Sequence, residues 1–414
     1  MITLIKKIAI YTSFMYSAHY ASVQAATLID LGHAAGAQCT TAWVNDNSQI
    51  VGNCTPPSTT ANNAPWLAAN LNTPQQTLPP LASGQPCWVI GISNSGAIVG
   101  NCNDANNIPF AVTWNAASPT TSPTQLKPLP GTLLFPLLRP ADVKTALSAQ
   151  NKHGAVLGKS ISPGSEATVV LYLSGANTPL RISDWGDNCS GADINSTSIN
   201  GYPSIAMNCP GTGGTFIASV VMRGVSGYSR TTLATPPGAS YCFVTSLNDQ
   251  LQLVGTCIYP NSAANVSKTA FWASPTSIPN MLEVPVSTKN YGVAINSQGK
   301  ILARGMGSQG ISQDLFWEDP STTFSVQPIL PLSGSVSTTA VGLADNNTVA
   351  LNCENASEHP TGCIWTSTGG TQALSPINGG LKSWLNGISS SGEYVFGSAN
   401  NSSQNQSAVA ATLP

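Results

Sequence analysis

The chain has 414 residues, a formal net charge of −2 and only 8% charged residues, although 42% of its residues are hydrophobic. This weakly acidic balance excludes a nucleic-acid partner, which needs a basic surface. The hydrophobic content suffices for a large core, and the 37 glycines and 30 prolines are typical of a turn-rich all-β protein.

The N-terminus has the pattern of a secretory signal peptide. Lys6 and Lys7 precede a short apolar stretch, and small residues precede a cleavage point after Ala25. We therefore expect residues 1–25 to be removed and the mature chain to be periplasmic or extracellular. The alternative is a disordered or membrane-anchoring leader. No later stretch approaches 18 uninterrupted apolar residues, so we expect no membrane span in the mature chain.

A hairpin motif begins at Cys39 and ends at Cys54. Fourteen residues separate the cysteines, and an Ile-Val-Gly triplet lies shortly before the second cysteine. The spacing recurs from Cys87 to Cys102 and from Cys242 to Cys257. Two β-rich runs around a polar turn predict a β-hairpin. With a constant register, Val44 faces Gln49, Trp43 faces Ile50 and Cys39 faces Cys54.

The ten cysteines follow an export signal, which indicates an oxidising compartment and structural disulfides rather than metal ligands. They fall into five local pairs, namely Cys39 with Cys54, Cys87 with Cys102, Cys189 with Cys209, Cys242 with Cys257, and Cys353 with Cys363.

The motif belongs to a longer repeat. Its copies align on the residue before the turn: Val44, Ile92, Gln150, Ile194, Leu247, Ile295, Leu343 and Ile388. Each copy of roughly 48 residues contains four short apolar runs, the pattern of one propeller blade. We predict a single domain, residues 26–414, forming an eight-bladed β-propeller of four-stranded antiparallel blades. Seven blades are the alternative, because the third copy matches weakly.

The two ends of the mature chain complement each other. The eighth copy stops at Pro414 without a fourth strand, whereas Thr27 to Leu31 form a strand before the first hairpin. We expect this N-terminal strand to complete the last blade and to close the ring, which removes an open sheet edge.

Three departures from the repeat predict local differences. The fourth copy has an enlarged turn, Ser196 to Pro203, and Leu133 to Pro140 form an extra connection. In the seventh copy Thr338 takes the place of the partner cysteine, so we expect Cys353 to pair with Cys363 on the next strand.

The segment Ile295 to Ile301, with its Ile-Asn-x-x-Gly-x-Ile order, and the run Ala270-Phe271-Trp272 resemble the bacterial extracellular HAF repeat. Thr27 to Gly32 also resemble that family's Asp-Leu-Gly segment. The histidine of the His-Ala-Phe triplet is absent here. The resemblance implies an exported, propeller-like scaffold without an established activity.

The sequence offers few candidates for chemistry, and we expect no catalytic residue, metal site or cofactor. The candidates are His33, His153, His359, Glu354 and Glu358, with Asp184 and Asp187 as a carboxylate pair. The histidines lack metal-ligand spacing, and the aspartates lack the order of a calcium loop. We interpret Glu354, Glu358 and His359 as a solvated loop and His153 as a turn residue.

Four tryptophans, Trp114, Trp272, Trp317 and Trp365, recur at one repeat position, which indicates core residues. Trp43, Trp185 and Trp384 fall off that pattern and are the aromatic candidates for a binding face.

These observations favour an exported, non-catalytic binding or interaction module that recognises an extracellular or envelope ligand, a glycan or a protein. The contacts would come from polar loops, namely residues 56–63, 103–107, 261–267 and 400–407. One alternative is an extracellular hydrolase of a polysaccharide or another polymer, with acidic residues converging at the central channel. Another is a structural protein of the cell envelope.

Overall fold

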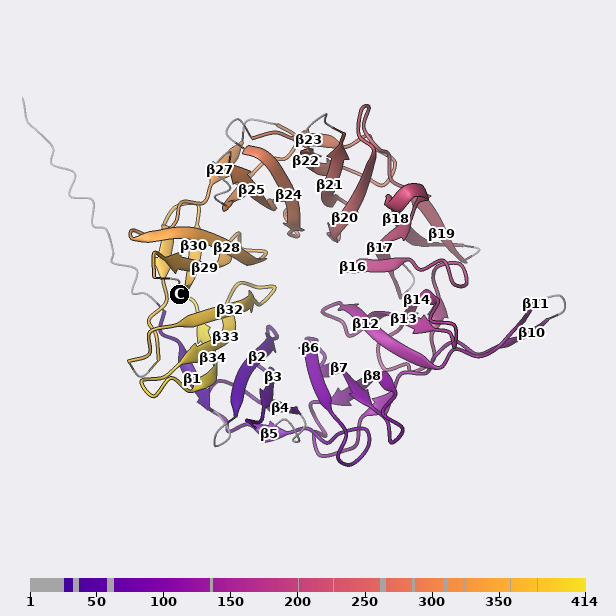
Figure 1. Ribbon diagram of the computed structural model, residues 1–414, viewed down its shortest axis with the longest axis horizontal. Coiled ribbons are helices and arrows are strands. Elements are labelled where there is room, and N and C mark those ends of the chain that lie inside the picture. The colour runs from indigo at the N-terminus through magenta and orange to yellow at the C-terminus, as the bar shows by residue number, and fades with distance from the viewer. Residues whose placement is uncertain are drawn as a thin grey trace, which may run out of the picture.

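The computed structural model describes residues 26–32, 37–57, 63–134, 137–199, 201–225, 227–260, 266–284, 287–307, 312–322, 325–357, 359–377 and 379–414. Short β-sheets stand radially around a central axis, and each sheet has one strand at the axis and one at the periphery (Figure 1). In the described ranges the one helical element is the 3-10 turn η1 (Thr212–Gly214). These ranges contain no helix long and apolar enough to cross a membrane.

Five four-stranded sheets are antiparallel meanders in chain order, from the axis outward. The four-stranded sheets built this way are β2 (Gln38–Val44), β3 (Ile50–Thr55), β4 (Ala64–Ala68), β5 (Gln76–Thr77); β6 (Cys87–Ile92), β7 (Ala97–Asn103), β8 (Pro109–Asn115), β9 (Thr124–Gln125); β12 (Lys144–Gln150), β13 (Val156–Ile161), β14 (Ala167–Tyr172), β15 (Leu180–Arg181); β24 (Ser287–Ile295), β25 (Ile301–Gly307), β26 (Ser312–Trp317), β27 (Val326–Pro328); and β28 (Ser335–Leu343), β29 (Val349–Asn355), β30 (Pro360–Thr366), β31 (Gly370–Ala373).

Two further meanders share one sheet. They are β16 (Ser190–Ile199), β17 (Tyr202–Pro210), β18 (Phe216–Gly224), β19 (Gly227–Thr232) and β20 (Tyr241–Leu247), β21 (Leu253–Tyr259), β22 (Val266–Trp272), β23 (Asn280–Leu282). A single parallel pairing, Ile217 with Cys242, joins β18 to β20. The enlarged turn expected in the fourth copy, Ser196 to Pro203, is largely strand instead, because β16 and β17 extend into it as far as Ile199 and Tyr202.

The last sheet contains both ends of the described chain. Its order is β32 (Ser383–Ile388), β33 (Tyr394–Asn400), β34 (Gln406–Thr412) and then β1 (Ile29–Gly32). β1 pairs antiparallel with β34, with Ile29 opposite Ala410. The N-terminal strand therefore supplies the outer strand that the C-terminal segment lacks, as the sequence predicts.

The register of the first hairpin differs from the constant-sum prediction. Cys39 faces Cys54 as expected, but Val44 faces Ile50 rather than Gln49, and Trp43 faces Val51 rather than Ile50. The turn is one residue longer than predicted, and a β-bulge between Thr41 and Trp43 compensates for it. A bulge at the same place interrupts the other strands at the axis, namely β6, β12, β16, β20, β24, β28 and β32.

The glycine of the Ile-Val-Gly triplet lies against the backbone next to this bulge. A Cβ atom on Gly52 would collide with the carbonyl oxygen of Thr40, and one on Gly100 with that of Trp88. The bulged strand thus leaves no room for a side chain opposite it. This close approach explains why a glycine follows the two aliphatic residues of the triplet.

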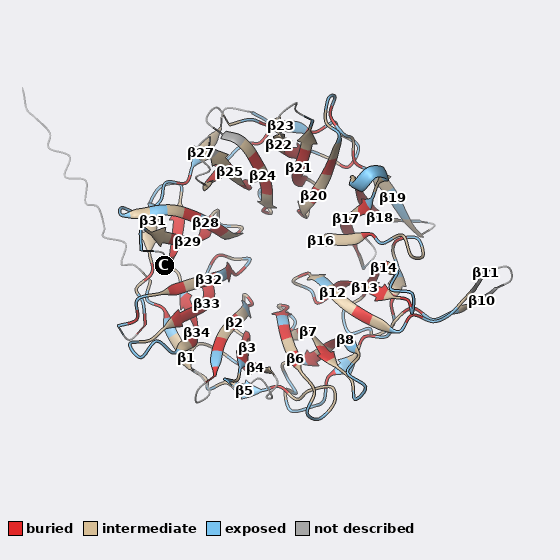
Figure 2. Cartoon of the chain, viewed as in Figure 1, coloured by how far each residue is buried: buried red, intermediate tan, exposed pale blue. Residues whose placement is uncertain are grey.

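The apolar core lies between neighbouring sheets and not within one (Figure 2). Trp114, Trp272, Trp317 and Trp365 are all at most 5% exposed, which confirms that the recurrent tryptophans are core residues. The aliphatic residue that follows several short outer strands is also buried, as Leu78, Leu126 and Ile329 show. Because both faces of a sheet are covered, its strands read as nearly continuous apolar runs.

Asparagine side chains add polar links between adjacent sheets. Asn53 of β3 donates to the carbonyl oxygen of Val89 at 2.8 Å and accepts from the amide of Val89 at 2.7 Å. Asn208 pairs in the same way with Val244, and Asn352 with Leu385. The amide imitates a strand partner, so the second strand of one sheet is held to the axial strand of the next.

All five predicted disulfides form. Cys39–Cys54, Cys87–Cys102, Cys189–Cys209 and Cys242–Cys257 join the first two strands of a sheet, whereas Cys353–Cys363 joins the second and third. Thr338 faces Cys353 at the position of the missing cysteine, as expected.

The stretch predicted as an extra connection is itself a β-hairpin. β10 (Thr132–Leu134) pairs with β11 (Leu137–Arg139) and projects away from the ring (Figure 1).

Candidate functional site

The hairpin turns that follow the axial strands gather at one end of the central axis. Asn45 begins the first of these turns and is 2% exposed. Its Oδ1 accepts hydrogen bonds from the amides of Asn47 (3.1 Å) and Gln49 (2.9 Å), while its Nδ2 donates to the carbonyl oxygen of Ser93 at 2.8 Å. One side chain therefore shapes its own turn and holds the neighbouring one.

Asn151, Asn248 and Asn296 repeat this arrangement. Each accepts two amide hydrogen bonds within its turn and donates to a carbonyl oxygen of the next turn, those of Asn195, Asn296 and Ala344. The asparagine of the Ile-Asn-x-x-Gly motif is thus buried, and both its oxygen and its nitrogen form hydrogen bonds.

Hydrogen bonds of 2.6 to 3.0 Å connect the turns in succession and return to the first. They run from Asn45 Nδ2 to Ser93 O, Asn94 N to Lys152 O, Asn151 Nδ2 to Asn195 O, Ser196 N to Asp249 Oδ1, Asn248 Nδ2 to Asn296 O, Asn296 Nδ2 to Ala344 O, Asp345 N to Ser390 O and Ser391 N to Asp46 Oδ1. We call this set of turns the polar collar.

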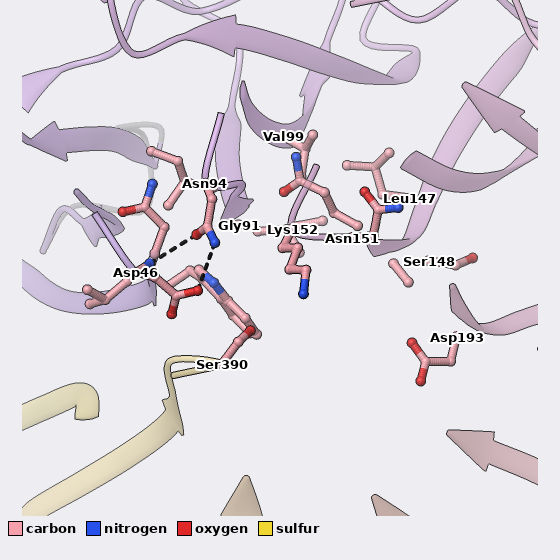
Figure 3. Close-up of a pocket in the computed structure, with 17 residues that line it drawn as sticks. Asp46, Gly91, Asn94, Val99, Leu147, Ser148, Asn151, Lys152, Asp193 and Ser390 are labelled. Carbon is pink, nitrogen blue, oxygen red and sulfur yellow. Dashed lines mark hydrogen bonds between the residues drawn. The ribbon is translucent and has the colours of Figure 1, made fainter. Parts of the chain in front are cut away.

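A cavity of about 300 Å³, the axial pocket, lies beside the collar between β2, β6 and β12 (Figure 3). Trp43, Ile90 and Leu147 form its apolar wall. Trp43 and Ile90 are 38% and 40% exposed, so apolar surface faces the pocket. The Trp43 ring packs against Phe396 with centroids 5.4 Å apart, which fixes its position.

A second cavity of about 180 Å³ adjoins the rest of the collar and shares Lys152 and Ser390 with the axial pocket. Its other lining residues come from β16 and from the ends of β20, β24 and β28 with the turns that follow these strands. The two cavities together follow the axis past every axial strand.

The carboxylates of Asp46 and Asp249 in the collar accept hydrogen bonds from neighbouring turns. Asp46 accepts from Nδ2 of Asn94 at 2.7 Å and from the amide of Ser391 at 3.0 Å. Asp249 accepts from the amides of Ser196 and Thr197, and its other oxygen lies 3.8 Å from Nζ of Lys152. These groups stabilise the collar and are not arranged as a pair of acid and base.

Asp193 lines the axial pocket from β16. It accepts hydrogen bonds from Ser246 Oγ (2.9 Å), the amide of Leu247 (2.8 Å) and its neighbour's amide. Burial raises the pKa of this carboxyl group, against the hydrogen bonds, which lower it.

The candidate residues chosen from the sequence do not meet in one site. His153 is an exposed turn residue of the collar, whose backbone amide donates to Asn151, as expected. Glu354 accepts from Ser337, and the His359 amide donates to Asn355. His33, Glu358 and the expected leader lie outside the described residues, as do parts of the proposed binding loops, 58–62 and 261–265.

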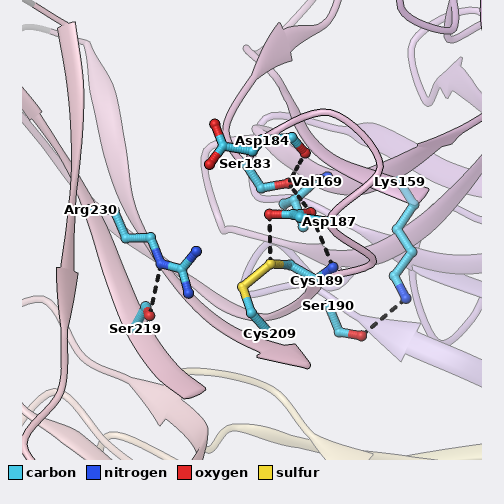
Figure 4. The surroundings of a disulfide bond; sticks show 10 residues. All are labelled: Lys159, Val169, Ser183, Asp184, Asp187, Cys189, Ser190, Cys209, Ser219 and Arg230. Atoms are coloured by element: carbon cyan, nitrogen blue, oxygen red, sulfur yellow. Dashed lines mark hydrogen bonds between the residues drawn. A yellow bond between two sulfur atoms is a disulfide. The ribbon is translucent and has the colours of Figure 1, made fainter. Parts of the chain in front are cut away.

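The side chains of Asp184 and Asp187 lie in different environments (Figure 4). Asp187 accepts from Ser183 Oγ at 2.8 Å, and its other oxygen lies 2.8 Å from Sγ of Cys189, whereas Asp184 is exposed. Asp187, Cys189 and Cys209 form a compact group with metal-ligand atoms. Both sulfurs belong to a disulfide, so they are not the thiolates that a metal binds.

The sequence did not identify Asn45 and the equivalent asparagines of the other turns as functional residues. It also did not identify Asp46, Lys152 and Asp193. The signal was present, because an asparagine recurs directly after the axial strands. It was read as a turn preference, since a contact between residues 48 positions apart follows only from the arrangement of the sheets.

No family model and no curated protein matches the sequence. Solved structures do match. The β-propeller domain of the Trilobed protease from Pyrococcus furiosus superposes with a TM-score of 0.50 at 11% identity, over 83% of this chain and 99% of that one. The chain has a β-propeller fold.

Two larger neighbours match over part of their length. A post-proline cleaving enzyme from Rickettsia typhi gives a TM-score of 0.53 at 8% identity, over 92% of this chain and 56% of that chain. A structure from a study of two prolyl endopeptidases gives 0.54 at 13% identity, over 84% and 49%. The propeller thus spans about half the length of these two relatives.

These comparisons contradict the function expected from the sequence. The solved propellers that resemble this chain come from a protease, a post-proline cleaving enzyme and a prolyl endopeptidase study, not from glycan-binding scaffolds. The expected non-catalytic scaffold with rim-loop recognition is therefore corrected. The polysaccharide-hydrolase and envelope-protein alternatives also lack support there, and the collar acids are held by neighbouring turns.

Proposed function

We propose that this protein is a peptidase-type propeller that admits an extended peptide to its axial pocket and positions it for cleavage. The observation that carries the proposal is the axial pocket itself, with the apolar wall of Trp43, Ile90 and Leu147 beside the hydrogen-bonding collar. The fold similarity to propellers of peptide-cleaving enzymes supports it.

The pocket chemistry suits a peptide that contains proline. The exposed, fixed indole of Trp43 offers a flat apolar surface, on which a proline ring packs well, and Ile90 extends that surface. Gln150 and Ser148 lie at the same wall and offer hydrogen-bonding groups for peptide carbonyls. Lys152, whose Nζ lies 3.8 Å from Asp249, stands at the edge and offers a further hydrogen-bond donor to peptide carbonyls.

Peptide binding tests this function. A fluorescein-labelled, proline-containing octapeptide should bind the purified protein. Ile90→Arg should weaken binding at least tenfold, because the longer side chain fills the pocket and its charge is costly to desolvate. Val225→Arg, at a fully exposed hairpin residue, is the matched control and should leave the anisotropy titration unchanged. Equal binding by both variants, or no binding by the parent, would refute the proposal.

We further infer that the propeller has eight blades and that β1 closes the ring. The third copy contributes a complete set of four strands, β12–β15, which supports eight rather than seven. The pairing of β1 with β34 and the return of the collar bonds from Ser391 to Asp46 support closure. Deleting residues 26–32 should then lower the melting temperature and increase aggregation, because the edge of β34 becomes free.

We also propose that the chain is an exported member of the HAF-repeat group. Five disulfides are consistent with an oxidising compartment. Intact-mass measurement of the protein expressed with its leader should give a chain that starts at Ala26. A chain retaining residues 1–25 would contradict the proposed cleavage.

A further inference from the structure

Three of the five arginines of this charge-poor chain line one cavity at the side of the propeller. Arg181 belongs to the outer strand β15, and Arg223 and Arg230 belong to β18 and β19 of the next meander. The cavity has a volume of about 370 Å³ and is separate from the axial pocket, with which it shares no residue.

Aromatic and hydroxyl groups contact all three guanidinium groups, and Arg181 lies over the ring of Trp185, 5.3 Å from its centroid. Arg223 lies over the rings of Tyr202 and Tyr228, at 4.5 and 5.6 Å from their centroids, and the two rings meet edge to face. Arg230 donates from Nε to Ser219 Oγ at 3.0 Å (Figure 4). Cation–π contacts orient a guanidinium group without neutralising it.

The cavity carries an excess of positive charge. Among its lining residues the one carboxylate is that of Asp184, which is 92% exposed and lies 4.0 Å from Arg181. Such an exposed contact contributes little. The positive charges of three arginines that line one cavity repel each other, and an anion in the cavity relieves that repulsion.

We propose that this cavity binds a tetrahedral oxyanion, the phosphate or sulfate group of an ester ligand. Three guanidinium groups from three strands offer donors to three oxygens, a geometry that the two oxygens of a carboxylate do not match. Val221 and the ring of Tyr228 line the same cavity and contact the organic part of the ester. This site is independent of the proposed peptide binding.

Strand length distinguishes this meander from the others in the described part of the chain. β19, the outer strand of this meander, extends through six residues on the nine-residue β18, whereas the outer strands of the other sheets have two to four. Register places Arg223 opposite Tyr228 and Arg230 opposite Val221 on this longer ladder. The extension therefore carries two of the arginines beyond the reach of a standard blade and beside β15.

Calorimetric titration with phenyl phosphate and phenyl sulfate at low ionic strength tests the proposal. One saturable site is expected, and Arg223→Gln and Arg181→Gln should each weaken it about tenfold, as expected for a lost charge-assisted hydrogen bond. Arg181 is substantially exposed, so its variant remains folded. Arg181→Lys keeps the positive charge but cannot donate two parallel hydrogen bonds as a guanidinium group does, so it should retain part of the affinity that Arg181→Gln loses.

Two controls separate this site from general charge effects and from the axial pocket. Lys127→Gln removes an exposed positive charge elsewhere, and Ile90→Arg blocks the axial pocket; both should keep the wild-type affinity for phenyl phosphate. Absence of saturable binding, equal affinity in the arginine variants, or tighter binding of benzoate than of phenyl phosphate would overturn the proposal.

Discussion

Asn45 and Ser93 are 48 positions apart, yet the side-chain amide of Asn45 lies 2.8 Å from the carbonyl oxygen of Ser93. The contact joins the turns of two neighbouring blades. The same relationship links Asn248 to Asn296 at 3.0 Å. Neighbouring blades are thus attached at the axis by hydrogen bonds between turns, four of which are buried, in addition to the apolar contacts between their faces.

Replacing one of these asparagines should destabilise the whole ring. Asn296→Ala removes acceptors for two turn amides and a donor to Ala344, so we expect the free energy of unfolding to fall by about 2 kcal/mol or more. Urea unfolding followed by tryptophan fluorescence measures it. Asn106→Ala, at an exposed residue, is the control and should stay within about 0.5 kcal/mol of the parent.

Removing a disulfide should weaken the protein without unfolding it. For Cys39→Ser combined with Cys54→Ser, restriction of the unfolded chain predicts a loss of about 3 kcal/mol. The hairpin from Ile295 to Ile301 has the same bulge and turn without a cysteine, so the ring should persist. A far-ultraviolet circular dichroism spectrum typical of an unfolded chain at room temperature would contradict this expectation.

The triplet glycine should tolerate no side chain. Gly100→Ala places a methyl group against the carbonyl oxygen of Trp88 and the ring of Trp114. Backbone displacement at this bulge should cost about 1 to 3 kcal/mol. Gly164→Ala is the matched control, because a Cβ atom there meets only Ser162 Oγ, at 3.7 Å. If both variants melt at the parental temperature, the explanation given for the glycine is wrong.

The buried carboxyl group of Asp193 should make stability depend on pH. Burial raises its pKa in the folded state, so the folded protein binds more protons than the unfolded chain between the ordinary and the raised pKa. Stability therefore decreases as pH rises through this window. Asp193→Asn removes the contribution, and its stability relative to the parent should rise with pH from about 4 upward, measured by urea unfolding. A difference that falls with pH would exclude this sign.

Much of the fold follows from the sequence because its repeat is regular. The spacing from Cys39 to Cys54 predicted the hairpin and the disulfide pairing, and Cys353 with Cys363 followed from a single departure at Thr338. The strand at Ile29 was predicted from what the last copy lacked.

The register near the turn could not be predicted, because two one-residue offsets cancel at the cysteines. The bulge between Thr41 and Trp43 is invisible in the spacing, and it moves Trp43 by one pairing position. The exposure of Trp43 in the axial pocket was consequently not foreseen, although the residue was a candidate on its own.

The arginine-lined cavity and the smaller cavity beside the collar could not be predicted from the sequence for a related reason. Arg181 and Arg230 lie in different repeats at positions that do not correspond, so no periodicity brings them together. Lys152 and Asp249 likewise meet across turns of nonadjacent copies. Contacts of this kind depend on how blades are placed around the axis, and local patterns carry no information about that placement.

The pairing of Ile29 with Ala410 has a consequence for the order in which the molecule can be assembled. β1 finds its partner in β34, near the other end of the described chain, so the final sheet cannot form until Thr412 has been synthesised. A nascent chain that stops before Gln406 holds β1 with nothing to pair with, and the exposed strand is then open to intermolecular association. Synthesis through β34 is therefore a condition for the native sheet, and products truncated before β34 should accumulate as aggregates or be degraded.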